Sequence, residues 1–133
     1  MCVAAVWPVE DVAANYPMAL DAKQNLLFVG CRQPAKLLVL DSRDGSRLET
    51  LDCGGDADDL FIDETNGRVY VACGEGGSTC SRPSGRSSHT LLHSIETVSG
   101  ARTALWDPKG RRLFLATPRR GDAVATIRVY EAP

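Results

Sequence analysis

The sequence predicts an all-β fold assembled from repeated units of four short antiparallel strands. Two observations support this prediction. Short segments of alternating apolar residues recur along the 133-residue chain, separated by polar stretches of turn length. In addition, one pattern occurs three times at intervals of 42 and 44 residues. A chain of this length with 44% apolar residues predicts a single domain over residues 1–133.

Three aspartates mark the repeat: Asp21, Asp63 and Asp107. Each closes a short apolar segment and is followed by a polar turn and an alternating apolar strand. We expect each aspartate to cap its turn by accepting hydrogen bonds from backbone N–H groups, as in Asx turns. An aromatic residue follows each aspartate after seven positions, namely Phe28, Tyr70 and Phe114. We expect Phe28 and Phe114 to fill the core between neighbouring units.

The first unit continues with two further strand-like segments, residues 36–41 (KLLVLD) and 47–52 (RLETLD), joined by a turn that contains Asp44-Gly45. Four strands in about forty residues, without helical periodicity, are typical of a β-propeller blade. The chain therefore predicts about three four-stranded antiparallel blades. Because closed propellers have four to eight blades, we expect an incomplete ring.

The repeat also predicts where each blade lies. Residues 1–14 are expected to form the outer strand of a preceding blade, residues 15–55 one blade, residues 56–100 a second, and residues 101–133 a last blade that lacks its outer strand. This arrangement is what the C-terminal part of a larger propeller should show. Open blade edges expose unpaired backbone, which predicts self-association.

Residues 15–45, 56–76 and 100–133 resemble the bacterial YVTN-type β-propeller repeat proteins, relatives of the WD40-like superfamily. The resemblance leaves out residues 77–88. It implies a non-catalytic binding or interaction scaffold whose protein or small-molecule ligand is unknown. The alternative is a fragment of a propeller enzyme, either a metal-dependent lactonase or hydrolase, or a quinoprotein-like redox protein. A fold does not fix a function, so both remain open.

A polar tract over residues 76–89 lies where the third strand of the second blade is expected. It contains Pro83 and no Val, Ile, Leu or aromatic residue, and it predicts a disordered loop inserted into the blade. We consider three interpretations: a phosphorylatable linker, a basic phosphate-binding loop with Arg82 and Arg86, and a reading-frame shift that was later restored. We favour the third, because this tract read in another frame can encode an apolar strand.

Blade geometry, rather than any motif, selects the candidate binding residues. The segment entering the first strand and the loop after the second strand lie on the same face, around the mouth of the central channel. Loops held on a rigid scaffold commonly carry binding residues. The candidates on this face are Asn15, Tyr16, Arg32, Asp56, Asp58, Asp59, Glu75, Arg102, Arg119 and Arg120.

Two charged groups within this set have alternative interpretations. Asp56, Asp58 and Asp59 carry oxygen ligands suited to Ca²⁺ or Mg²⁺, but their spacing is not that of an EF-hand loop, and we predict no metal site. We expect a solvated acidic turn or salt bridges to a neighbouring blade. The arginines Arg32, Arg102, Arg119 and Arg120 would form an anion site if they converge; the alternative is ion pairs with the same aspartates.

The composition excludes several functional classes. A net charge of −2 argues against nucleic acid and anionic membranes as partners. We find no signal peptide or transmembrane segment, so we expect the chain as it stands to be cytoplasmic, although full-length relatives of the resembled family are often exported. The five cysteines form no CxxC pair and are expected to be small buried thiols.

Catalytic chemistry finds little support in the sequence. No nucleophile elbow, zinc-protease, P-loop or dinucleotide-binding motif is present. The two histidines, His89 and His93, lie close together without partners for a triad or a zinc site. We therefore expect no cofactor and favour a protein that is not an enzyme.

Overall fold

The structure is a computed structural model that describes residues 1–85 and 88–132. Within these ranges the chain contains strands and no helix, which confirms the all-β prediction. The first sheet contains β1 (Ala13–Asp21), β2 (Leu26–Gln33), β3 (Ala35–Asp41) and β4 (Arg47–Asp52). The second contains β5 (Ala57–Asp63), β6 (Arg68–Cys73), β7 (Gly77–Gly85) and β8 (Ser88–Glu96), and the third contains β9 (Ala104–Asp107), β10 (Arg112–Thr117) and β11 (Thr126–Glu131).

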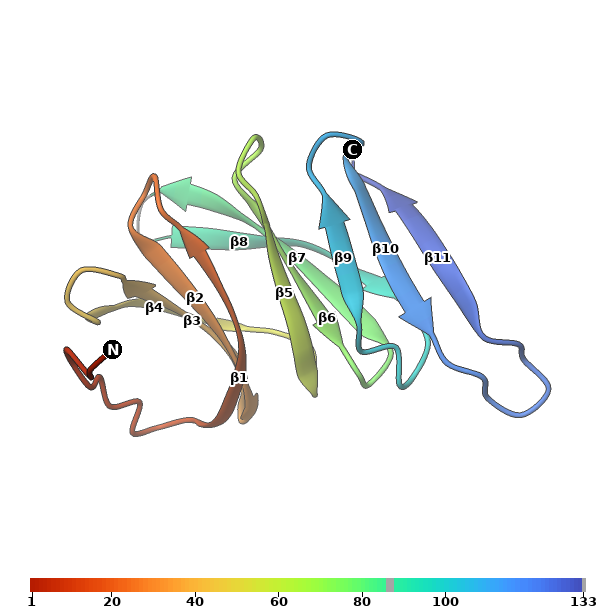
Figure 1. Ribbon diagram of the computed structural model, residues 1–133, viewed down its shortest axis with the longest axis horizontal. Helices are drawn as coiled ribbons and strands as arrows, with labels where there is room; N and C mark the ends of the chain where they lie inside the picture. Colours follow the sequence, from red (N-terminus) through yellow and green to blue (C-terminus); the bar gives the residue numbers. More distant parts are fainter. Residues whose placement is uncertain (86–87, 133) are drawn as a thin grey trace.

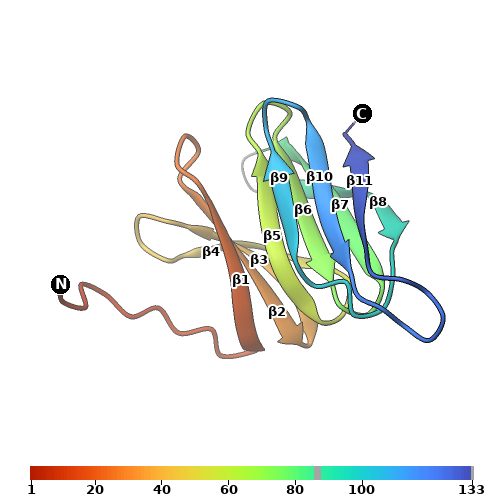
Figure 2. The same ribbon diagram turned by 45° about the vertical axis from the view of Figure 1, so that its right-hand side comes forward.

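Every strand pairs antiparallel with the next strand of its own sheet, so that each sheet is an up-and-down meander. The three sheets lie side by side and fan apart (Figures 1 and 2). Strand β5 contacts both β1 and β9, which makes the first strand of each sheet its inner strand. No helix that is long and apolar enough to cross a membrane occurs among the described residues.

The repeated aspartates cap the turns, as predicted. Oδ1 of Asp21 accepts hydrogen bonds from the backbone N–H groups of Lys23 and Gln24, both at 3.0 Å. Asp63 and Asp107 make the equivalent contacts at 3.0 to 3.3 Å. Asp21 and Asp63 are buried, so these bonds satisfy carboxylates that have little access to water. The sequence repeat is therefore also a repeat of turn chemistry.

An apolar core joins the first and second sheets. The first sheet contributes Leu26, Phe28, Leu37 and Val39, and the second contributes Leu60, Val69, Val71 and Cys73. A smaller core with Ala72, Ala101 and Leu115 joins the second and third sheets. Alternation along the strands produces both cores, because successive side chains point to opposite faces of a sheet. The central sheet is thus apolar on both faces.

The polar tract differs from its predicted state. Residues 77–85 form strand β7, which pairs with β6 from Gly77 to Ser81 and with β8 along its length, so the prediction of a disordered loop over 76–89 was wrong for these residues. Backbone pairing, with a strand on each side of residues 77–81 and with β8 alone beyond them, compensates for the lack of apolar side chains. Pro83 lies beyond the part paired with β6, so its missing N–H interrupts no bond to that strand. Arg86, of the phosphate-binding interpretation, lies outside the described residues.

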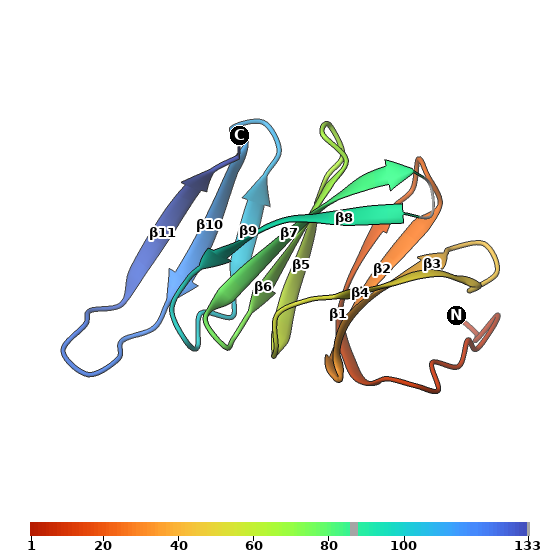
Figure 3. The ribbon, with the colours of Figure 1, turned by 180° about the vertical axis from the view of Figure 1, so that it is seen from behind.

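The N-terminal segment also differs from its prediction as an outer strand. Residues 1–12 form no strand, and β1 begins at Ala13. A strand needs a hydrogen-bonding partner, and no strand of the described residues pairs with this segment. Instead it runs along the face of the first sheet that points away from the second (Figure 3), where Val9 and Val12 pack against the cluster of Val29, Cys31, Leu38 and Leu40.

Candidate functional site

Three of the predicted site positions are brought to one end of the fold by the repeat. Tyr16, Asp58 and Arg102 each lie five residues before a capping aspartate, where the chain enters the inner strand of its sheet. Two residues earlier, Ala14, Asp56 and Gly100 all have positive φ, at 54°, 56° and 84°. The same left-handed turn therefore begins each sheet. In the second sheet this turn directs the Asp56 carboxylate toward its neighbours.

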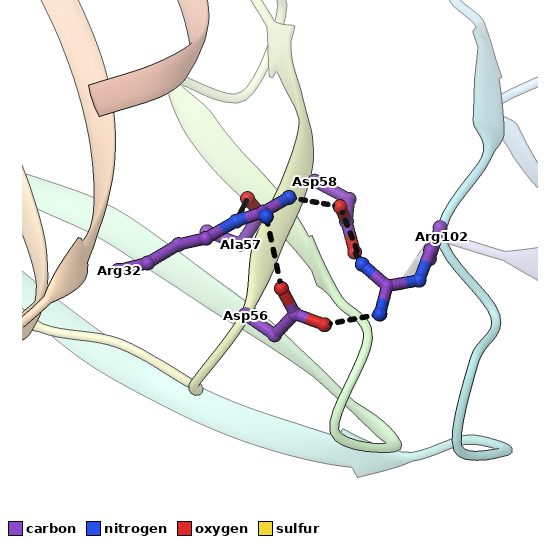
Figure 4. Close-up of polar contacts among 5 residues, drawn as sticks. All are labelled: Arg32, Asp56, Ala57, Asp58 and Arg102. Atoms are coloured by element: carbon purple, nitrogen blue, oxygen red, sulfur yellow. Dashed lines mark hydrogen bonds and ion pairs between the residues drawn. The ribbon is translucent and has the colours of Figure 1, made fainter. Parts of the chain in front are cut away.

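Arginines from the two outer sheets meet aspartates of the central sheet (Figure 4). Arg32, in β2, donates through Nε to the carbonyl oxygen of Ala57 at 3.0 Å, lies 3.2 Å from the Asp56 carboxylate and pairs with Asp58. Arg102, before β9, lies 2.6 Å from Asp56 and 3.0 Å from both oxygens of Asp58. We call these four residues, Arg32, Asp56, Asp58 and Arg102, the Arg–Asp network. It connects all three sheets.

Gly74 makes room for the Arg–Asp network. A Cβ atom at this position would lie 2.5 Å from Oδ2 of Asp56, 2.7 Å from Oδ2 of Asp58 and 3.1 Å from Cζ of Arg102. The Gly74 backbone also ties the loops together, because its N–H donates to Asp56 O and its carbonyl accepts from Gly100 N, both at 2.7 Å. The absence of a side chain is thus a steric requirement of the network.

The charges of the network balance, with two guanidinium groups against two carboxylates. Hydrogen bonds to Asp56 and then to Asp58 raise the pKa of Arg102 above its usual value. Of the two alternatives for the arginines, Arg32 and Arg102 follow the ion-pair one. The oxygens of Asp56 and Asp58 are engaged by these arginines, and no group of three or more His, Cys, Asp or Glu side chains with metal-binding geometry occurs in the described part of the chain.

Tyr16 extends the network toward solvent. The guanidinium carbon of Arg32 lies 4.7 Å from the centroid of the Tyr16 ring, a cation–π contact. The tyrosine remains 63% exposed. Arg32 is itself held by Ala57 and the two aspartates, so the ring rests on a fixed support.

The remaining candidates lie around the network without joining it. Asp59 accepts a hydrogen bond from the backbone N–H of Ala104 at 3.0 Å, a further link between the second and third sheets. Asn15 is exposed on β1. The Glu75 carboxylate lies over Gly55, and the Arg120 guanidinium lies over Gly100. Arg119 is exposed in the loop after β10.

Sequence reasoning did not identify Ala57, Gly74 or a shallow pocket beside the third sheet. The pocket has a volume of about 450 Å³ and is lined in part by Val98, Pro118, Asp122 and Arg128. Its lining comes from a loop and a strand end that share no motif. The sequence does point to position 74. Gly74 follows Asp63 by the same number of residues as Arg32 follows Asp21, so the repeat places both at the end of the second strand of their blades.

No protein-family model matches the chain, and no curated protein matches it. Among solved structures, the chain is similar to part of the mitotic checkpoint complex (19% identity, TM-score 0.67, 75% of this chain and 33% of that chain). It is also similar to a candidate 6-phosphogluconolactonase from Bacteroides uniformis (12%, 0.68, 90% and 37%). A third similar structure is the Cps50 (Swd1) β-propeller domain of Myceliophteria thermophila (16%, 0.55, 90% and 41%).

These similarities concern the fold, because all three identities are low. The chain spans between 33 and 41% of the length of the three structures. Taken with the three sheets of meandering strands, the comparisons show that this all-β chain has a β-propeller architecture, in which each sheet is a blade and the ring is not closed.

Proposed function

We propose that this chain contributes blades to a propeller of the YVTN type that serves as a non-catalytic binding or interaction scaffold. We further propose that the binding end is the one that carries the Arg–Asp network. The observation that carries the proposal is Tyr16, which is 63% exposed while its ring rests on the immobilised Arg32 guanidinium. An exposed aromatic ring in a fixed position loses little conformational entropy when a partner covers it.

The surroundings of Tyr16 support a protein partner. Tyrosine and arginine are enriched among the residues that dominate binding energy at protein interfaces. The surrounding polar groups are the exposed side chains of Asn15 on β1 and of Glu75 and Arg119 in neighbouring loops. The fold is also one found in an assembly, since a similar structure belongs to the mitotic checkpoint complex.

The test is a quantitative comparison of co-purifying proteins between the wild type and variants at the two ends of the blades. Tyr16→Ala and Arg119→Glu alter the proposed binding end, and Lys109→Glu, in an exposed turn at the other end of the third sheet, is the matched control. We expect at least one partner to be lost with the first two variants and retained with the control. Partners that bind all variants equally would contradict the assignment of the binding end.

The alternative is a fragment of a propeller enzyme. It has one specific observation in its favour, the similarity to the candidate 6-phosphogluconolactonase. It is tested by incubating the purified chain with 6-phosphogluconolactone, with and without added Ca²⁺ or Mg²⁺, and following acid release. Hydrolysis above the spontaneous rate that is abolished by Asp56→Asn would support the enzyme, and the spontaneous rate alone would support the scaffold.

A further inference from the structure

The third sheet has an exposed apolar face. Leu105, Ile127 and Val129 are between 51 and 64% exposed. Pairing places Phe114 directly between Leu105 and Val129 in one row across the sheet, and Ile127 lies on the same face two residues along β11. In the described residues, β11 pairs with β10 alone, so its outer edge is open as well.

The first sheet has a second exposed apolar face at the other end of the row of blades. Met18 and Leu20 are 61 and 53% exposed, and they pair across the strands with Val29 and Leu27. The N-terminal segment covers only part of this face, through Val9 and Val12. Exposed apolar faces of this kind mark interaction surfaces.

The repeat shows that these two faces are complementary. Phe114 and Val129 of the third sheet occupy the positions of Phe28 and Val39, which pack against the second sheet. Likewise, Met18 and Leu20 of the first sheet are equivalent to Leu60 and Ile62 of the second sheet. Leu60 and Ile62 are the residues that the second sheet packs against the first. The exposed face of the third sheet therefore matches the exposed face of the first in the way that consecutive sheets match inside the chain.

The N-terminal segment already lies where a partner strand is needed. Residues 5–10 lie 42 positions before β4, so the repeat makes this segment equivalent to an outer strand. Val9 is equivalent to Leu51 of β4. Val9 packs on the exposed face of the first sheet, and Leu51 packs in the core between the first and second sheets. In a closed arrangement this segment would be the outer strand of whichever sheet docks on the first one. Pro8 is compatible with that role, because an outer strand has one unpaired edge.

We propose that two copies of this chain associate head to tail, so that the third sheet of each copy docks on the first sheet of the other. Residues 5–10 of one copy then pair with the open edge of β11 in the second copy. Two copies give six sheets, which is within the range of four to eight blades found in closed propellers. Each copy supplies both complementary faces, one on its first sheet and one on its third.

The first measurement is the mass of the purified 133-residue chain in solution, by size exclusion with light scattering over a range of concentrations. One chain has a mass of 14.3 kDa, and we expect twice this value. A chain that stays at 14.3 kDa at all concentrations while retaining β circular dichroism overturns the proposal, as does an open series of larger oligomers.

The second measurement identifies the surfaces with single charges. Val129→Lys alters the third-sheet face and Leu20→Glu the first-sheet face; both side chains are already more than half exposed, so the blades should still fold. We expect either variant alone to be monomeric, because each carries the charge at both junctions. The exposed turn variant Lys109→Glu is the control and should remain dimeric.

Mixing the two variants gives the decisive result. A dimer of one Val129→Lys copy and one Leu20→Glu copy has two different junctions. One joins two wild-type faces, and in the other the introduced lysine faces the introduced glutamate, so we expect dimers to reappear. An interface between two copies of the same face predicts otherwise: one of the variants would still dimerise alone, and mixing would restore nothing. Either of these outcomes overturns the head-to-tail arrangement.

Discussion

Asp58 is the point at which Arg102 joins the third sheet to the second. Nη1 of Arg102 lies 3.0 Å from both carboxylate oxygens of Asp58, and Arg32 of the first sheet binds the same carboxylate. The Asp58 side chain is only 11% exposed. A single aspartate therefore holds three sheets together at one end, in an environment where its charge is only partly screened by water.

We expect Asp58→Asn to lower the free energy of unfolding by about 1 to 3 kcal/mol, because it leaves two guanidinium groups facing one carboxylate. The half-exposed Arg102 makes the lower part of this range the expectation. Urea denaturation of both proteins measures the difference. The exposed Asp122 provides a matched control, and Asp122→Asn should change the stability by less than about 0.5 kcal/mol. Equal losses in the two variants would show that the network does not stabilise the fold.

The two aromatic residues of the repeat, Phe28 and Phe114, should differ in their contribution to stability. Phe28 is 2% exposed in the core between the first and second sheets, whereas Phe114 lies half-buried on the open face of the third. We expect Phe28→Ala to cost about 3 to 5 kcal/mol, as for other buried aromatic residues. Phe114→Ala should cost about 1 to 2 kcal/mol in the monomer. Thermal unfolding at low protein concentration tests this, and equal costs would mean that Phe114 is covered as well.

Much of the fold could be predicted from the sequence, since local and repeated features determine it. The capping aspartates, the aromatic positions and the alternating strands all follow from spacing that the chain displays three times. Strand β7 could not be predicted in this way. Its residues have little strand propensity of their own, and the strand exists through its pairing with β6 and β8. The blade pattern predicted a strand at this position, but the composition argued for a loop.

The site was predictable only as a set of positions on one face. Spacing placed Arg32, Asp58 and Arg102 at the same end of neighbouring sheets, but not their mutual distances. Whether arginines pair with aspartates or point outward as an anion site depends on how closely the sheets pack, which is a tertiary property. The positive φ at Ala14 was also hidden, because alanine gives no signal for a left-handed turn.

Ala14 is therefore a position where a glycine should stabilise the chain. Its φ of 54° is strained for a residue with a Cβ atom, and Gly100 occupies the equivalent position in the third sheet. We expect Ala14→Gly to raise the free energy of unfolding by about 0.5 to 1 kcal/mol. Ala13→Gly, one residue earlier in β1 and without a positive φ, should instead lower it by about 0.5 to 1 kcal/mol. Chemical denaturation would contradict this interpretation if both variants changed stability in the same direction.

Cys53 should make the stability fall in alkaline solution. Burial raises the pKa of its thiol from 9.0 to about 12, with smaller contributions from Cys73 and Cys31. Between these pH values the unfolded chain loses the proton while the folded chain keeps it, so the free energy of unfolding falls as the pH rises. The thiol's stabilising contribution is complete below pH 9 and is lost progressively toward pH 12.

Removing the thiol isolates its contribution from those of the other titratable groups. We expect the free energy of unfolding of Cys53→Ala to fall less steeply than that of the wild type between about pH 9 and 11. The difference in slope cannot exceed about 1.4 kcal/mol per pH unit, the limit for one proton. The comparison uses slopes, so any loss that the substitution causes at neutral pH does not affect it. Identical slopes would mean that the Cys53 thiolate forms as readily in the folded chain as in the unfolded one.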